Sequence, residues 1–168
     1  MQTERSRKPD AVKRDVDITY RLPFRRTVVF EAWVNPAYLA QWFAPQGCTI
    51  RFKKLELYEG GSFHSCIDNP VSGECWCIGT YLQIKSPEKI VFTMIIADEN
   101  GNEVDPASVG MDSAWPGRTN VNVTFREENG ETIVNLKQTA DEALAKRTGA
   151  HPSWLQMLDN MRSLISTI

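Results

Sequence analysis

The fold of this chain is indicated first by residues 28–45, which read VVFEAWVNPAYLAQWFAP. Apolar and aromatic side chains recur there at helical spacing, with Trp33 before a break and Trp42 after it. Asn35 followed by Pro36 is a helix start signal, because an asparagine side chain caps the first turn and proline suits the first helical position. The stretch therefore predicts two short helices that are dense in aromatic groups.

Strand patterns surround these helices. Residues 16–22 alternate apolar and polar side chains, which is typical of a half-buried strand. Turn formers such as Gly60-Gly61 and Asn129-Gly130 separate the strands that follow. These strands are expected at residues 49–57, 62–67, 74–84, 89–97, 120–126 and 132–138. Because most gaps are short, we expect sequential hairpins in an antiparallel meander.

The last segment predicts a long amphipathic helix, with a shorter one at residues 141–147 before it. Its apolar side chains recur at steps of three and four residues: Trp154, Met157, Leu158, Met161, Leu164, Ile165 and Ile168. A face that broad must pack on the sheet. The predicted fold class is α+β, a curved antiparallel sheet of six to seven strands wrapped around a long C-terminal helix, with two short helices after the first strand.

Length and composition indicate one domain. The chain has 168 residues and a net charge of −2. We expect a polar, mobile tail at residues 1–15 and a single domain at residues 16–168. Near-neutral charge disfavours nucleic-acid binding. Without an apolar run of ~20 residues or a secretory signal, we expect no membrane span, a cytoplasmic monomer and mostly reduced cysteines.

Residues 98–118 are expected to form a long loop. A loop of that length in a compact domain is either a lid or binding segment or a floppy excursion, and the sequence leaves both open. Asp98, Glu103, Asp112 and Arg118 are candidate acid–base groups in it, although charged loop residues are usually just solvated.

Several stretches are similar to proteins related to the heat-shock-protein-90 ATPase activator. They are Val29-Phe30-Glu31-Ala32-Trp33 with Asn35-Pro36, Leu39, Trp42 and Pro45, then Gly60-Gly61-Ser62-Phe63, and the hairpin GTYLQI at residues 79–84 with PEKIVFT at residues 87–93. Residues 119–125, Thr132 and the helix of Trp154 complete the pattern. The resemblance covers nearly everything after the tail. It implies the helix-grip fold shared with START domains and birch-pollen-allergen-like proteins, and a cavity between the sheet and the last helix. It also implies a heat-shock chaperone as a partner.

An apolar cavity needs large, adaptable side chains around it. Phe63, Ser65 and Ile67 share one strand face, and Trp76, Ile78 and Thr80 share one face of the next strand. If these faces look inward, the predicted ligand-binding residues are Phe30, Trp33, Phe63, Ile67, Trp76, Phe92, Met94, Trp115, Trp154, Met157 and Met161. The alternative is that these groups pack on one another as a core.

A metal site is a second candidate. His64 and Cys66 lie two residues apart, as do Cys75 and Cys77. In a hairpin that pairs Cys66 with Cys75 and His64 with Cys77, the four ligands would cluster and suit zinc. The alternatives are a Cys66–Cys75 disulfide in oxidising conditions, or cysteines that act as small buried hydrophobes.

The favoured function is binding of a small hydrophobic or aromatic molecule that is lipid-, polyketide- or flavonoid-like, and a role in the stress response is a further expectation. No Ser-His-Asp order, phosphate loop or H-E-x-x-H motif is present, and His64 and His151 are the only histidines. We therefore predict no cofactor and favour a non-enzyme. The alternatives are a chaperone-linked interaction module that stimulates a heat-shock ATPase, and a cyclase or hydrolase of polyketide-like substrates.

Overall fold

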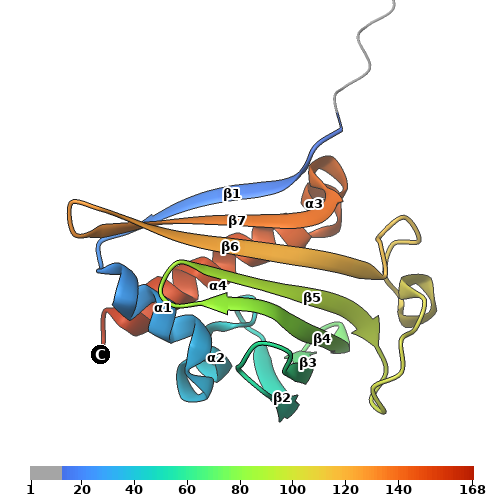
Figure 1. Ribbon diagram of the computed structural model, residues 1–168. Coiled ribbons are helices and arrows are strands. Elements are labelled where there is room, and N and C mark those ends of the chain that lie inside the picture. Colours follow the sequence, from blue (N-terminus) through green and yellow to red (C-terminus); the bar gives the residue numbers. More distant parts are fainter. Residues whose placement is uncertain (1–12) are drawn as a thin grey trace, which may run out of the picture.

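One antiparallel sheet of seven strands organises the molecule (Figure 1). The computed structural model describes residues 13–168, so residues 1–12 of the expected tail lie outside the described residues. The strand order is β1-β7-β6-β5-β4-β3-β2, so the chain's first strand closes the sheet beside its last. The strands are β1 (Asp15–Leu22), β2 (Thr49–Leu55), β3 (Ser62–Asn69), β4 (Gly73–Lys85), β5 (Lys89–Ala97), β6 (Arg118–Glu128) and β7 (Glu131–Asp141).

The four α-helices lie where the sequence predicts them, whereas the short 3-10 helix falls within the expected long loop. They are α1 (Arg26–Val34), α2 (Pro36–Trp42), the short 3-10 helix η1 (Pro106–Val109), α3 (Glu142–Thr148) and α4 (Ala150–Ile165). Asn35 caps α2, because its Oδ1 accepts a hydrogen bond from the Ala37 N–H at 3.0 Å. The helix α4 runs behind the sheet in Figure 1 and contacts β1, α1 and α2. The predicted fold class is confirmed.

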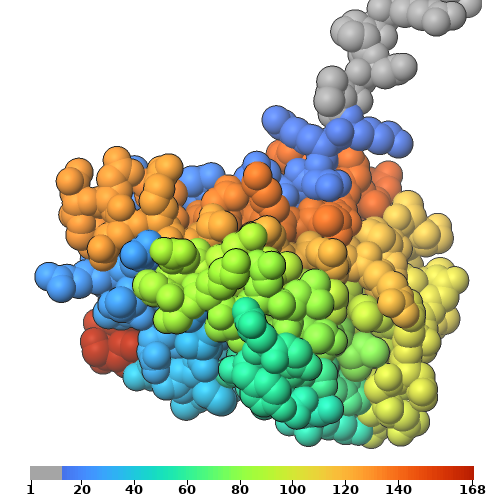
Figure 2. Space-filling view, in the orientation of Figure 1, coloured from blue at the N-terminus to red at the C-terminus, as the bar shows by residue number. Residues whose placement is uncertain are grey.

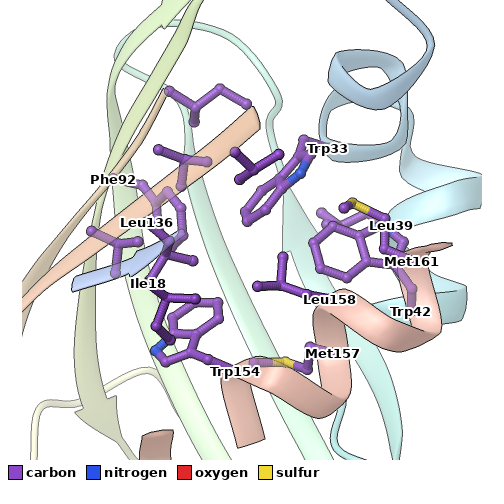
Figure 3. Close-up of a cluster of buried hydrophobic side chains, with 14 of the residues drawn as sticks. Ile18, Trp33, Leu39, Trp42, Phe92, Leu136, Trp154, Met157, Leu158 and Met161 are labelled. Carbon is purple, nitrogen blue, oxygen red and sulfur yellow. The ribbon is translucent and has the colours of Figure 1, made fainter. Parts of the chain in front are cut away.

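The space between α4 and the sheet is filled by side chains. Figure 3 shows Trp154 and Leu158 of α4 directed toward the sheet residues Ile18 and Leu136. On the other side, Met161 meets the aromatic groups of α1 and α2. These side chains are almost completely buried. Side chains of α4, of the sheet and of α1 and α2 therefore pack against one another between the last helix and the sheet.

The turn between β2 and β3 depends on Glu56 and Gly61. The Glu56 carboxylate accepts hydrogen bonds from the Tyr58 hydroxyl at 2.8 Å and from the Ser62 N–H at 3.1 Å. These two bonds lower the pKa of Glu56 to about 2. A Cβ on Gly61 would lie only 2.3 Å from the Glu56 carbonyl oxygen, so the second glycine of the pair is required by close backbone approach.

The long loop between β5 and β6 is packed against the body of the molecule. Figure 2 shows it in yellow along one end of the surface. Trp115 and Pro106 are buried, and Asp112 forms an ion pair with Arg147 of α3 at 3.5 Å. These contacts hold the loop against the core, so it covers part of the core and does not extend freely into solvent.

Candidate ligand pocket

A small apolar pocket lies beside α4 instead of beneath it. It occupies the concave side of β3, β4 and β5, where α1 and α2 cover the sheet, and its volume is about 80 Å³. Its walls are Trp33, Leu39, Phe43, Phe52, Phe63, Ser65, Ile67, Cys75, Cys77, Tyr81, Ile90, Phe92, Met94 and Ile96. None of these residues belongs to α4.

Five of the predicted ligand-binding residues line this pocket. They are Trp33, Phe63, Ile67, Phe92 and Met94. Phe63 and Ile67 alternate on β3 with Ser65 between them, as the period of a strand requires. The inward face expected for β3 is therefore the observed one.

Five others pack elsewhere in the core. The Phe30 ring meets Phe125 edge to face with centroids 5.2 Å apart. The Trp154 indole N–H donates to Gln138 Oε1 at 2.9 Å. Trp115, Met157 and Met161 are buried and do not line the pocket. These five residues pack against other core residues, as the alternative interpretation of the sequence expects.

The expected orientation of Trp76 is wrong. In the β3–β4 register Trp76 is opposite Cys66 and Cys77 is opposite Ser65, so Trp76 lies on the sheet face that points away from the pocket. The guanidinium of Arg51 and the ammonium of Lys53 lie 4.8 and 4.9 Å from the Trp76 ring. These cations cover the indole and explain its low exposure.

The same register separates the four candidate zinc ligands. His64 pairs with Ile78 and Cys66 with Trp76, whereas Cys75 and Cys77 occupy the other face of β4. The expected pairing was one residue out, and a slip of one residue moves every side chain to the opposite face. The register assumed for the candidate four-ligand site is therefore wrong, and it also separates Cys66 from Cys75, the pair in the alternative disulfide; all four cysteines are free.

Few polar groups enter the pocket. The Trp33 Nε1–H is buried and has no hydrogen-bond partner among residues 13–168. Burial raises the pKa of the Tyr81 hydroxyl and raises the pKa of the Cys77 thiol to about 12, so both are neutral near pH 7. No Asp, Glu, Lys, Arg or His side chain of the described residues lines the walls. The pocket therefore suits a neutral molecule.

The candidate acid–base residues do not converge on the pocket. Glu103 and Arg118 form an ion pair on the surface. Asp98 accepts hydrogen bonds from the backbone N–H groups of Asn100 and Asn102 at 2.9 Å, which stabilise the turn after β5. These contacts lower the pKa of Asp98, with the Asn102 N–H as the largest cause. All three groups have structural partners, and none lies in the pocket walls.

Nine residues of the pocket wall were not predicted as ligand contacts. They are Leu39, Phe43, Phe52, Ser65, Cys75, Cys77, Tyr81, Ile90 and Ile96. The alternation of side chains along a strand could have identified three of them. Phe63 points into the pocket, and the observed β3–β4 register then places Cys75, Cys77 and Tyr81 on the same side of the sheet.

Together, the fold and the pocket define a helix-grip domain, a curved sheet that holds a long C-terminal helix. Residues 23–166 match the model of the family described as Activator of Hsp90 ATPase homolog 1-like protein. The chain belongs to this family.

Solved structures agree with the fold. The AHSA1 protein from Silicibacter pomeroyi is 15% identical, covers 92% of this chain and 99% of its own, and has a TM-score of 0.70. An AHSA1-like protein from Aeromonas hydrophila is 20% identical over 90% of this chain and 93% of its own, with a TM-score of 0.62. A protein from Staphylococcus epidermidis is 23% identical over 94% of this chain and 93% of its own, with a TM-score of 0.74.

A comparison with functionally curated proteins found no significant match. In residues 13–168, none of the helices has the length and apolar character needed to cross a membrane.

Proposed function

We propose that this protein binds a compact, neutral, apolar molecule in the pocket between α1, α2 and β3–β5. The observation that carries the proposal is an almost entirely apolar pocket whose wall includes Trp33, a residue whose buried indole N–H has no hydrogen-bond partner among residues 13–168. A buried donor without an acceptor costs about 1–3 kcal/mol. A ligand that brings one hydrogen-bond acceptor would recover that cost.

The pocket volume limits the size of the ligand. Ligand pockets for drug-sized molecules enclose ~300–1,000 Å³, and a dry cavity of ~150 Å³ holds benzene. At about 80 Å³, this pocket is too small for a lipid, a flavonoid or a polyketide. Phe52, Ile67 and Met94 are only partly buried, so a single-ring ligand has room to extend toward this edge. Met94 is a flexible side chain that adapts to such a guest.

The expected affinity is modest. A single ring that buries roughly 150 Å² of apolar surface gains about 4 kcal/mol at ~25 cal/mol per Å². That corresponds to a dissociation constant of about 1 mM, before any gain from the Trp33 hydrogen bond. Screening must therefore use millimolar concentrations of compact aromatic alcohols, ketones and heterocycles.

Chemical-shift mapping tests the proposal. We expect saturable shifts for residues of the pocket wall, including the Trp33 indole N–H. Ser65→Leu fills the pocket from its own wall and should abolish binding. Ser72→Leu, in the exposed turn between β3 and β4, is the matched control and should bind like the unaltered protein. A panel that shifts no pocket residue, or equal binding by Ser65→Leu, refutes the proposal.

A second candidate is an interaction with a heat-shock chaperone. It is supported by the family match, whose description names activation of the Hsp90 ATPase. Titrating this chain into Hsp90 should change the steady-state ATPase rate in a saturable way. An unchanged rate at a chain concentration far above that of the chaperone would exclude this function. The cyclase or hydrolase alternative loses its support, because its acid–base groups lie outside the pocket.

A further inference from the structure

We propose that the pocket selects a compact ring that carries a hydroxyl group, and that the hydroxyl of Ser65 is the group that recognises it. This inference rests on the proposed function, because it assigns a polar contact to the ligand of the same pocket. It makes Ser65 a specificity-determining residue.

Ser65 lies in the middle of the pocket floor. It is opposite Phe52 of β2 on one side and Cys77 of β4 on the other, and Cys77 is opposite Ile96 of β5. Residues that are directly opposite in neighbouring strands share a sheet face, so these four side chains form one row across β2–β5. All four line the pocket. Phe52 and Ile67, the neighbours of Ser65 on this face, are half-buried, so the row lies near the edge where the pocket opens.

The Ser65 hydroxyl is available to a ligand. Its side chain is only 5% exposed, and the hydroxyl group has no hydrogen-bond partner among residues 13–168. A hydroxyl both donates and accepts, whereas an indole N–H only donates and a sulfur atom accepts weakly. Ser65 and Tyr81 carry the only side-chain oxygens among the described residues of the wall. A ligand that donates a hydrogen bond can therefore find a strong side-chain acceptor only at these two residues.

The Phe63 ring separates Tyr81 from Ser65. Cys77, which is opposite Ser65, and Tyr81 are four residues apart on β4, which is about 13 Å along an extended strand. Gly79 lies between them, and the Phe63 ring covers it, since a Cβ on Gly79 would be 2.4 Å from that ring. The Tyr81 ring packs against Phe63 with centroids 5.7 Å apart. Ser65 is therefore the hydroxyl group on the open side of the pocket.

The wall favours a phenol over an acid or a hydrocarbon. No Lys, Arg or His side chain of the described residues lines the pocket, so nothing there would balance the charge of a carboxylate. A phenol stays neutral near pH 7, because its ordinary pKa is about 10. A hydrocarbon of the same shape would leave the Ser65 hydroxyl buried and unpaired, and a site of this kind discriminates against such a ligand.

A matched pair of ligands tests the assignment. Phenol and toluene have nearly the same shape, and each is titrated into the full chain while the chemical shifts of pocket residues are recorded. We expect Ser65→Ala to weaken phenol binding by about 2- to 10-fold, the range of one hydrogen bond. Toluene binding should stay unchanged or tighten, because toluene forms no hydrogen bond with Ser65. Ser65→Cys keeps the shape of the side chain but offers only a weak acceptor, so it should behave like Ser65→Ala.

Tyr81→Phe is the matched control, because it deletes the other hydroxyl group of the wall and should leave the dissociation constant of phenol unchanged. The assignment is wrong if Ser65→Ala changes the dissociation constants of phenol and toluene by the same factor. It is also wrong if Tyr81→Phe weakens phenol binding as much as Ser65→Ala does. In both cases the ligands still bind in the pocket, so the proposed function stands. If neither ligand shifts a pocket residue, the assignment and the proposed function fail together.

Discussion

Replacement of Gly79 by alanine should destabilise the fold and close the pocket. Gly79 lies in the middle of β4 on the pocket side, and a Cβ built there would be 2.0 Å from the Thr93 carbonyl oxygen and 2.4 Å from the Phe63 ring. Both distances are far below van der Waals contact, so β5 or the ring must move. Forcing an extra carbon into a packed site costs about 1–3 kcal/mol.

The loss is measurable by thermal unfolding. For a domain of this size, 1 kcal/mol corresponds to about 2–4 °C in Tm, so Gly79→Ala should lower Tm by roughly 2–12 °C. The displaced Phe63 ring should also weaken binding of compact aromatic ligands, which chemical-shift titration would detect.

Gly117 is the matched control. A Cβ on Gly117 would meet its nearest neighbour, a Pro106 side-chain carbon, at 3.5 Å, which is ordinary contact. Gly117→Ala should therefore leave Tm unchanged or raise it slightly, since alanine restricts the unfolded chain. Equal Tm values for Gly79→Ala and Gly117→Ala would show that β4 and Phe63 do not pack as described.

Three further substitutions test other parts of the structure. Gln138→Leu removes the acceptor of the Trp154 indole N–H and should lower the free energy of unfolding in urea by about 1–3 kcal/mol. Adding Trp154→Phe removes the unpaired donor, so the double variant should recover part of this loss. A double variant destabilised by more than the summed losses of the two single variants would contradict this. The pKa of Glu56 is lowered from 4.5 to about 2, so its contribution to stability is present above pH 4.5 and is lost as the pH falls toward 2. Glu56→Gln should therefore lower Tm at pH 7, and the difference in Tm from the unaltered protein should shrink between pH 4.5 and 2. A difference in Tm that stays constant over this range would exclude the role. Asn35→Ala should cost about 1 kcal/mol in thermal unfolding and Asn35→Ser much less, and equal effects would argue against capping.

Local signals predicted most of the fold. Asn35-Pro36 correctly placed the start of α2, and the strand expected at residues 89–97 is β5 to the residue. The pairs Gly60-Gly61 and Asn129-Gly130 correctly marked the turns between β2 and β3 and between β6 and β7. Each of these features depends on interactions within a few residues, so composition and period were sufficient to find them.

The site was predicted less well because two of its properties are not local. The turn between Asn69 and Gly73 sets the β3–β4 register, and a difference of one residue moved Trp76 outward and Cys75 inward. Pocket volume is what remains after all side chains have packed. Trp154 and Met161 were suitable for either a cavity wall or a core, and their neighbours decided the outcome.

The sequence by itself determined the order of helices and strands, the antiparallel meander and the membership of the domain in its family. Only the tertiary structure decided which face of β4 looks inward and how much empty volume the aromatic groups leave. The physical reason is that helix and strand periods are encoded along the chain, whereas register and packing density result from contacts between segments distant in sequence.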